Sequence, residues 1–150
     1  MKREKCSTVL DGIRSYLGDD VVYARGCGVF DGTKEEQAEA VKLAEQADIT
    51  ILVLGGSSSR FGEVSFDANG AAISEHGVSM DCGEGVDTAD VALPAVQREL
   101  AEKVFATGSK VITVIIGGRG SAPEPVSEKS DALLYAFYPG MQGGKAIAEI

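Results

Sequence analysis

The stretch Ile49-Thr50-Ile51-Leu52-Val53-Leu54-Gly55-Gly56 decides the fold class, because it is a continuous apolar run, rich in β-branched residues, that a glycine pair closes. Such a run predicts a strand buried on both faces, the kind found in parallel sheets. Residues 111–116 have the same composition and are again followed by a glycine pair. Residues 132–137 predict a third strand of this type.

Helical patterns fill the intervals between these strands. Thr33 followed by Glu36 is a capping box, which predicts a helix from Lys34 to about Gln46. Pro94 suits the first turn of a helix that runs to about residue 107. The faces predicted to point inward carry Ala40, Val41, Ala44 and Ala47 in the first helix, and Val96, Leu100 and Val104 in the second.

The two ends of the chain extend this alternation. Ser7 is predicted to cap a helix through Leu17, residues 21–24 are predicted to form a short strand, and a last helix is predicted from Gln142 to the end. Strands alternating with helices predict one domain over residues 1–150, a three-layer α/β/α sandwich with a mostly parallel sheet. A chain that ends within a predicted helix is expected to be cut from a longer protein.

Composition excludes several classes of partner. The 150 residues carry 23 acidic and 14 basic side chains, a formal net charge of −9, so neither nucleic acid nor an anionic membrane is an expected partner. The N-terminus lacks the apolar stretch of a signal peptide, and no run is long enough to span a membrane. Three cysteines do not predict a disulfide framework, and we expect a cytoplasmic location.

The acidic residues gather in one long loop, from Gly55 to about Val91. Connections of this kind typically have about 2–6 residues. Its stretch 61–90 contains no Lys or Arg and seven acids, which are Glu63, Asp67, Glu75, Asp81, Glu84, Asp87 and Asp90. Parallel α/β sheets bind ligands at the carboxyl ends of their strands, where this loop begins. The loop is therefore the first candidate for a functional site.

Three interpretations of the loop stay open on composition alone: a solvated excursion, a calcium site, or a carboxylate that acts as general acid/base. The EF-hand spacing is absent, which disfavours calcium. The residues after the first strand, 55–60, match neither nucleotide-binding glycine motif. The single histidine, His76, has no catalytic partners in the sequence, and acidic neighbours make Cys82 a poor nucleophile. We expect neither a cofactor nor a metal.

Four segments, in order, resemble the C-terminal α/β domain of glycoside hydrolase family 3, the β-glucosidase and β-xylosidase family. The first two are residues 21–27, which end in Gly-Cys, and residues 46–55, which begin with Gln-Ala-Asp. The third is Cys-Gly-Glu-Gly-Val-Asp at 82–87, followed by Val-Ala-Leu-Pro at 91–94 and Gln97. The fourth is Tyr-Pro-Gly-Met-Gln-Gly-Gly-Lys-Ala-Ile-Ala at 138–148.

The resemblance implies a retaining exo-glycosidase whose nucleophile lies on an N-terminal (β/α)8 barrel that this chain lacks. The family pattern puts the general acid/base on Glu84, with Glu63 as the alternative. Asp87, Arg60 and Arg119 are the candidate substrate-binding residues. Arg119 follows the end of the second predicted strand, where it could be a carboxylate clamp or a surface charge. Thr88 replaces the arginine that the family usually has, and Gly118-Arg119-Gly120 replaces Gly-Arg-Pro.

Two functions follow as expectations. In the first, the parent enzyme hydrolyses short β-linked gluco- or xylo-oligosaccharides, and this chain is silent alone because half of a two-carboxylate site gives no covalent route. The surface that would meet the barrel should then be apolar and could drive homo-oligomerisation. The alternative is a non-catalytic flavodoxin-like module that binds a cation, a sugar or a protein.

Overall fold

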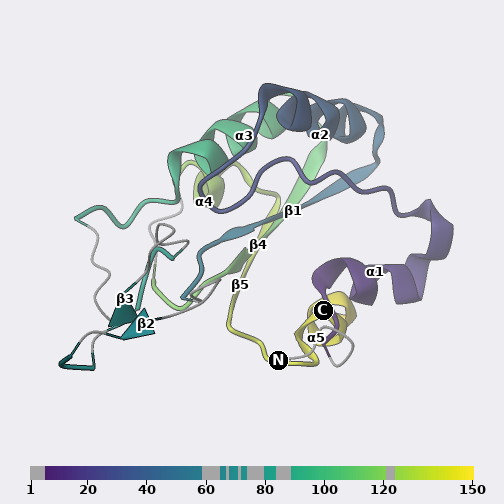
Figure 1. Ribbon diagram of the computed structural model, residues 1–150. Coiled ribbons are helices and arrows are strands. Elements are labelled where there is room, and N and C mark those ends of the chain that lie inside the picture. The colour runs from purple at the N-terminus through teal and green to yellow at the C-terminus, as the bar shows by residue number, and fades with distance from the viewer. Residues whose placement is uncertain are drawn as a thin grey trace.

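A three-stranded parallel sheet forms the centre of the molecule (Figure 1). The computed structural model describes residues 6–58, 65–66, 68–70, 72–73, 80–83, 89–120 and 124–150. The strands are β1 (Ile49–Gly55), β4 (Lys110–Ile116) and β5 (Ala132–Phe137), in the order β1-β4-β5. Ile49 lies opposite Lys110 and Gly55 opposite Ile116, so β1 and β4 end together. The three strands predicted from the apolar runs are confirmed.

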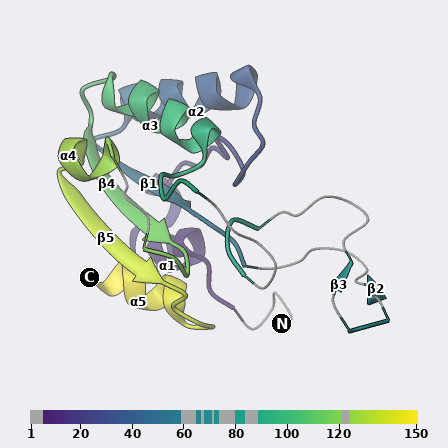
Figure 2. The ribbon, with the colours of Figure 1, turned by 90° about the vertical axis from the view of Figure 1, so that its left-hand side faces the viewer.

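Helices cover both faces of the sheet (Figures 1 and 2). On one face lie α2 (Lys34–Gln46), α3 (Ala95–Phe105) and α4 (Val126–Lys129), and on the other lie α1 (Val9–Leu17) and α5 (Gly143–Glu149). A 3-10 turn, η2 (Gly18–Asp20), follows α1, and a two-stranded antiparallel ribbon, β2 (Ser65–Phe66) with β3 (Ala72–Ile73), stands away from the sheet. The three-layer architecture is confirmed. No helix in the described ranges has the length and apolarity that crossing a bilayer requires.

The hydrophobic core lies between the sheet and the layer of α2, α3 and α4. Its buried members are Ala44, Leu52, Leu54, Leu93, Leu100, Ala101, Val104, Val111, Ile115 and Val126. Burying one Leu, Ile or Val side chain contributes about 1.5–3 kcal/mol, so this layer carries most of the stability. Of the residues predicted to face inward, Ala44, Leu100 and Val104 are fully buried, and Ala40 packs against the cluster.

The helix caps confirm one prediction and correct another. At α2, Thr33 Oγ1 accepts from the Glu36 N–H at 3.1 Å, and Glu36 Oε2 accepts from the Thr33 N–H at 2.9 Å. At α1 the cap is Thr8 and not Ser7, because Asp11 completes the same reciprocal box with Thr8. Ser7 instead donates its N–H to the Met141 carbonyl at 2.9 Å and so ties α1 to the segment that leads into α5.

Two predictions about the sheet were wrong. β1 is not buried on both faces, since Leu52 and Leu54 are buried but Ile49 and Val53 are about half exposed. Exposed and buried residues alternate along β1, so one face of this strand packs on the core and the other face is left uncovered. Residues 21–24 form no strand and run as coil. A β-branched run becomes a strand only when a neighbour accepts its hydrogen bonds, and the sheet offers it none.

α1 and α5 meet through two glycines. A Cβ built on Gly144 would overlap the carbonyl of Thr8, and one built on Gly12 would overlap the carbonyl of Gly144. The Gly144 N–H donates to the Ser7 carbonyl at 3.2 Å across the same contact. Both positions need glycine because the two backbones approach too closely for any side chain.

We expect Gly144→Ala to lower the free energy of unfolding by about 1–3 kcal/mol, the usual cost of overpacking a close contact. The matched control is Gly120→Ala, where an added Cβ meets nothing within 4 Å. Urea unfolding followed by circular dichroism measures both variants. Equal midpoints for the two variants would contradict the close helix contact.

Candidate functional site

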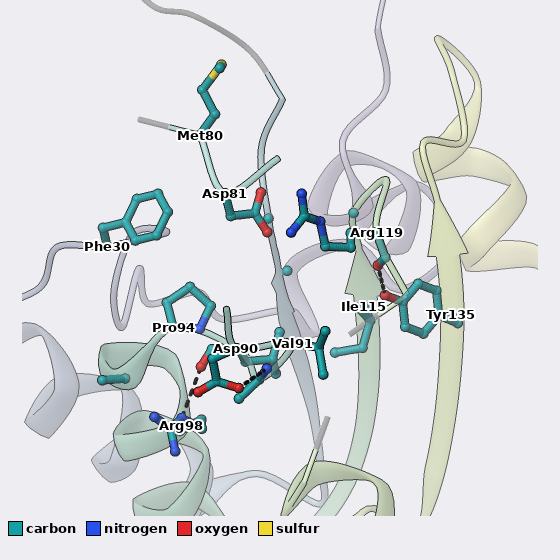
Figure 3. Close-up of a pocket in the computed structure, with 16 residues that line it drawn as sticks. Phe30, Met80, Asp81, Asp90, Val91, Pro94, Arg98, Ile115, Arg119 and Tyr135 are labelled. Atoms are coloured by element: carbon teal, nitrogen blue, oxygen red, sulfur yellow. Dashed lines mark hydrogen bonds between the residues drawn. The ribbon is translucent and has the colours of Figure 1, made fainter. Parts of the chain in front are cut away.

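A pocket of about 330 Å³ lies where β1 and β4 end (Figure 3). One side of the pocket is lined by Gly55 and Gly56 at the end of β1 and by Gly117 after β4. The start of α3 lines the other side. Ligands of open α/β sheets bind at this carboxyl edge. The pocket therefore occupies the position that the fold class predicts for a site.

Asp81 anchors the acidic loop to this pocket. Its carboxylate accepts a hydrogen bond from the Ser57 N–H at 2.7 Å, and its own N–H donates to the Ser57 carbonyl at 3.0 Å. Met80 and Cys82 on either side are buried, and the Cys82 sulfur lies 3.6 Å from the Tyr138 hydroxyl. Residues 80–83 are therefore held firmly against the strand ends, although they are far along the loop.

Arg119 lies across the pocket from the loop. Figure 3 shows its guanidinium turned toward the Asp81 carboxylate, and no ion pair joins these two side chains. The Tyr135 hydroxyl, from β5, donates to the Arg119 carbonyl and fixes the turn that carries this arginine. A guanidinium and a carboxylate that face each other without pairing can both hydrogen-bond a ligand between them.

The helix side of the pocket adds a second pair of charged residues. Arg98 Nε donates to the Leu93 carbonyl at 3.0 Å, and Asp90 Oδ1 accepts from the Ala92 N–H at 2.8 Å (Figure 3). With Asp81 and Arg119, the pocket lining holds two carboxylates and two guanidinium groups. Such a mixture of acceptors and donors suits a polar ligand rich in hydroxyl groups.

Gln97 holds the strand end that forms the pocket floor. This side chain is 2% exposed, its Oε1 accepts from the Gly55 N–H at 2.8 Å, and its Nε2 donates to the Gly55 carbonyl at 2.7 Å. The same Nε2 donates to the Val29 carbonyl at 3.0 Å. One amide therefore joins α3, the end of β1 and the loop before α2. Gly55 itself has φ +143° and lies too close to the Ile116 carbonyl for a Cβ.

An exposed charge cluster orders the loop that brings Phe30 to the pocket. Arg25 pairs with Asp31 at 2.6 Å and with Glu36 at 2.5 Å. The Thr33 backbone N–H and the Arg25 guanidinium lower the pKa of Glu36, and the Arg25 hydrogen bond lowers the pKa of Asp31. Burial raises the pKa of the Cys27 thiol, so this cysteine is not an activated thiolate.

One of the candidate site residues from the sequence lies among the described pocket residues. Arg119 lines the pocket, and its role in binding substrate stays a prediction. Glu84, Glu63, Asp87, Arg60 and His76 lie outside the described residues. In the parts of the chain that the structure describes, no group of His, Cys, Asp and Glu could hold a metal ion.

The residues missed as pocket residues are Asp81, Asp90, Arg98 and Tyr135. Asp81 and Asp90 were visible only as two of seven loop acids. Arg98 stands one turn after Pro94, a spacing that could have placed it at the helix start beside the strand ends. Tyr135 carries no local signal, because only the sheet order brings it there.

The fold and pocket define an α/β/α domain whose carboxyl edge carries a pocket lined by charged side chains, beside an unusually long acidic loop. The model of the glycosyl hydrolase family 3 C-terminal domain matches residues 1–150. The chain belongs to this family.

Known proteins of two activities resemble the chain. A β-xylosidase of Formosa agariphila is 34% identical over 145 residues, which are 95% of this chain and 17% of that protein. The structure of a β-glucosidase from Erythrobacter marinus superposes with a TM-score of 0.73 at 30% identity, over 97% of this chain and 21% of that one. A GH3 exo-β-xylosidase, solved with a xylobiose aziridine probe, gives 0.68 at 26% identity over 97% and 16%. The chain thus spans about a fifth of the length of these relatives.

Proposed function

We propose that the full-length protein is a retaining exo-acting β-glycosidase, a β-glucosidase or β-xylosidase, and that this domain supplies its acid/base loop. The observation that carries the proposal is the family match over residues 1–150 joined to an acidic loop anchored at Asp81 beside the pocket. One relative is named as a β-xylosidase and another as a β-glucosidase, so xylosides and glucosides are both proposed as substrates. The nucleophile, in this proposal, comes from an N-terminal (β/α)8 barrel.

Glu84 is the proposed general acid/base. It follows Asp81 by three positions in the sequence, and Asp81 lines the pocket. A retaining mechanism needs two carboxyl groups about 5–5.5 Å apart, one of them protonated at rest. Desolvation and neighbouring carboxylates are the two conditions that keep a carboxylic acid protonated near neutral pH, and a docked barrel would supply both. Glu63, on the same loop, is the alternative.

In the proposed cycle Glu84 acts first as an acid and then as a base. Glu84 first protonates the glycosidic oxygen as the barrel nucleophile attacks the anomeric carbon and expels the aglycone. The resulting Glu84 carboxylate then removes a proton from the water that hydrolyses the glycosyl-enzyme. Asp87, Arg60 and Arg119 are proposed to bind sugar hydroxyl groups, a role that the position of Arg119 in the pocket supports.

The barrel is proposed to dock on the carboxyl edge of the sheet. Exposed apolar side chains surround the pocket on this edge, among them Phe30, Val91, Phe137 and Tyr138, each at least 49% exposed. Without a partner, such a surface favours self-association. Homo-oligomerisation of the chain and its cytoplasmic location stay predictions.

We expect the 150-residue chain alone to give no turnover of 4-nitrophenyl β-xyloside or β-glucoside, because it lacks the proposed nucleophile. The full-length protein should hydrolyse at least one of these substrates. Steady-state absorbance assays on both proteins, prepared in parallel, make the comparison. If hydrolytic activity stays with the 150-residue chain through repeated chromatography, the proposed division of the site between two domains is overturned.

A further inference from the structure

Phe30 is an exposed aromatic side chain beside the pocket. It lines the pocket, is 51% exposed and lies outside the hydrophobic core. Single exposed apolar residues are common on protein surfaces, but Phe30 differs from most of them in how firmly its backbone is held.

The residues on both sides of Phe30 are fixed. The Val29 carbonyl accepts from Gln97 Nε2 at 3.0 Å, and the Asp31 carboxylate pairs with Arg25 at 2.6 Å. Gln97 also holds the end of β1, which lines the pocket, so one side chain ties the Phe30 loop to the pocket. A side chain carried on such a fixed loop loses little conformational entropy when it binds a ligand.

The two ends of this loop pack closely against α3. A Cβ built on Gly26, where φ is +68°, would lie 2.7 Å from the Leu100 side chain. A Cβ built on Gly32 would lie 3.2 Å from the Val96 side chain. Both ends of the loop therefore rest on the helix whose start forms the other side of the pocket.

The groups that face Phe30 across the pocket are polar. Figure 3 shows the Phe30 ring on one side of the Asp81 carboxylate and the Arg119 guanidinium on the other. A sugar ring presents an apolar face of C–H groups and a rim of hydroxyl groups. The apolar face leaves water when it covers an aromatic ring, and the hydroxyl groups need the acceptors and donors that Asp81 and Arg119 offer. This set of side chains matches a sugar.

The direction of proton donation decides which sugar binds here. In the proposed function the nucleophile on the barrel attacks the anomeric carbon, so the sugar that carries this carbon lies on the barrel. The acid/base protonates the glycosidic oxygen, which stays with the leaving group. Because this domain supplies the acid/base in that proposal, its pocket lies on the side of the leaving group. A volume of about 330 Å³, near the lower end of the range of about 300–1,000 Å³ for small-molecule sites, suits one sugar residue.

We propose that Phe30 is the platform on which the first sugar of the leaving group stacks. Asp81 and Arg119 bind hydroxyl groups at the rim of the same sugar. Phe30 thereby sets a preference for sugar over non-sugar leaving groups and takes no part in the chemical step. This inference rests on the glycosidase function proposed above and names the residue that selects the leaving group.

Two substrates of the full-length enzyme isolate this role. One is a β-1,4-linked disaccharide, xylobiose or cellobiose, and the other is the methyl β-glycoside of the same sugar. Both release an alcohol that needs a proton, so they make the same demand on the acid/base, but only the disaccharide has a sugar to stack. The measured quantity is kcat/KM for the disaccharide divided by kcat/KM for the methyl glycoside. This ratio does not depend on the fraction of the enzyme that is folded.

Three substitutions of Phe30 test the aromatic ring. Phe30→Ala should lower the ratio about tenfold or more, because the disaccharide loses a contact that the methyl glycoside never makes. Phe30→Leu keeps an apolar side chain without a flat face and should lower the ratio by at least about fivefold. Phe30→Tyr keeps the ring and should hold the ratio within about twofold of that of the unmodified enzyme.

A lowered ratio in Phe30→Ala and Phe30→Leu, with the ratio kept in Phe30→Tyr, supports the platform. Equal losses on both substrates leave the ratio unchanged and overturn it, since that result is expected if Phe30 only contacts the barrel. A ratio kept in Phe30→Leu also overturns it, because any apolar side chain would then suffice. If Phe30→Ala does not fold, Phe30→Leu decides. If the unmodified enzyme hydrolyses no substrate of either kind, the proposed function itself fails, and the inference fails with it.

Discussion

In the full-length enzyme, Glu84→Ala should lower kcat/KM on aryl glycosides with poor leaving groups by about 10²–10⁴-fold, the range typical for loss of a general acid/base. The loss should shrink on substrates with activated leaving groups, because these depart without a proton. The substitution leaves the proposed nucleophile in place, so such substrates should show a burst of aglycone and slow hydrolysis of the glycosyl-enzyme. Stopped-flow absorbance on a series of aryl β-xylosides and β-glucosides measures both effects.

The matched control is Glu63→Ala, which removes a carboxylate from the same loop. It should leave the dependence on leaving group close to that of the unmodified enzyme. If kcat/KM depends steeply on the leaving group in Glu63→Ala and only weakly in Glu84→Ala, the acid/base is Glu63. That result would contradict the Glu84 assignment. Far-ultraviolet circular dichroism on both variants checks that the comparison is between folded proteins.

Gln97→Leu should be strongly destabilising, because Gln97 holds the end of β1 that lines the pocket. The leucine fills the space of the amide but leaves the Gly55 N–H, the Gly55 carbonyl and the Val29 carbonyl without their partner. A buried polar group that loses its partner costs about 1–3 kcal/mol, so we expect a loss of about 3 kcal/mol or more in the free energy of unfolding. Urea unfolding measures it.

Gln37→Leu is the control for this prediction. Gln37 is also a buried helix glutamine, 3% exposed, but its Nε2 makes one long bond of 3.4 Å to the Val96 carbonyl and its Oε1 accepts from Lys103 Nζ at 2.6 Å. The lysine can turn to water when the glutamine is lost, and so we expect a loss of about 1 kcal/mol. If Gln37→Leu lowers the free energy of unfolding as much as Gln97→Leu does, the two hydrogen bonds between Gln97 and Gly55 contribute no additional stability.

Local signals predicted the parts of the fold that depend on neighbours in sequence. The apolar runs of β1, β4 and β5 and the Thr33–Glu36 capping box are of this kind, and all four are confirmed. The cap of α1 was misplaced by one residue because Ser7 and Thr8 are both good caps, and only the Asp11 contact distinguishes them.

Features that depend on distant partners could not be predicted. The composition of residues 21–24 favours a strand, yet a strand also requires a neighbour, which the described sheet does not provide. The one-sided burial of β1 depends on which part of the sheet the helices cover, which a continuous apolar run does not reveal. The same holds for the pocket residues. The sequence made Arg119 a candidate because it follows a predicted strand, whereas Tyr135 reaches the pocket only because β5 lies beside β4.

The most direct test of the central claim, that this domain provides the acid/base of a retaining glycosidase, is azide rescue of Glu84→Ala in the full-length enzyme. Azide needs no general base, so it should restore turnover of an activated aryl glycoside and give the β-glycosyl azide, identified by proton NMR. The account predicts this product for Glu84→Ala and none for the unmodified enzyme or Glu63→Ala. Full activity of Glu84→Ala without azide, or rescue that yields no β-glycosyl azide, would contradict it.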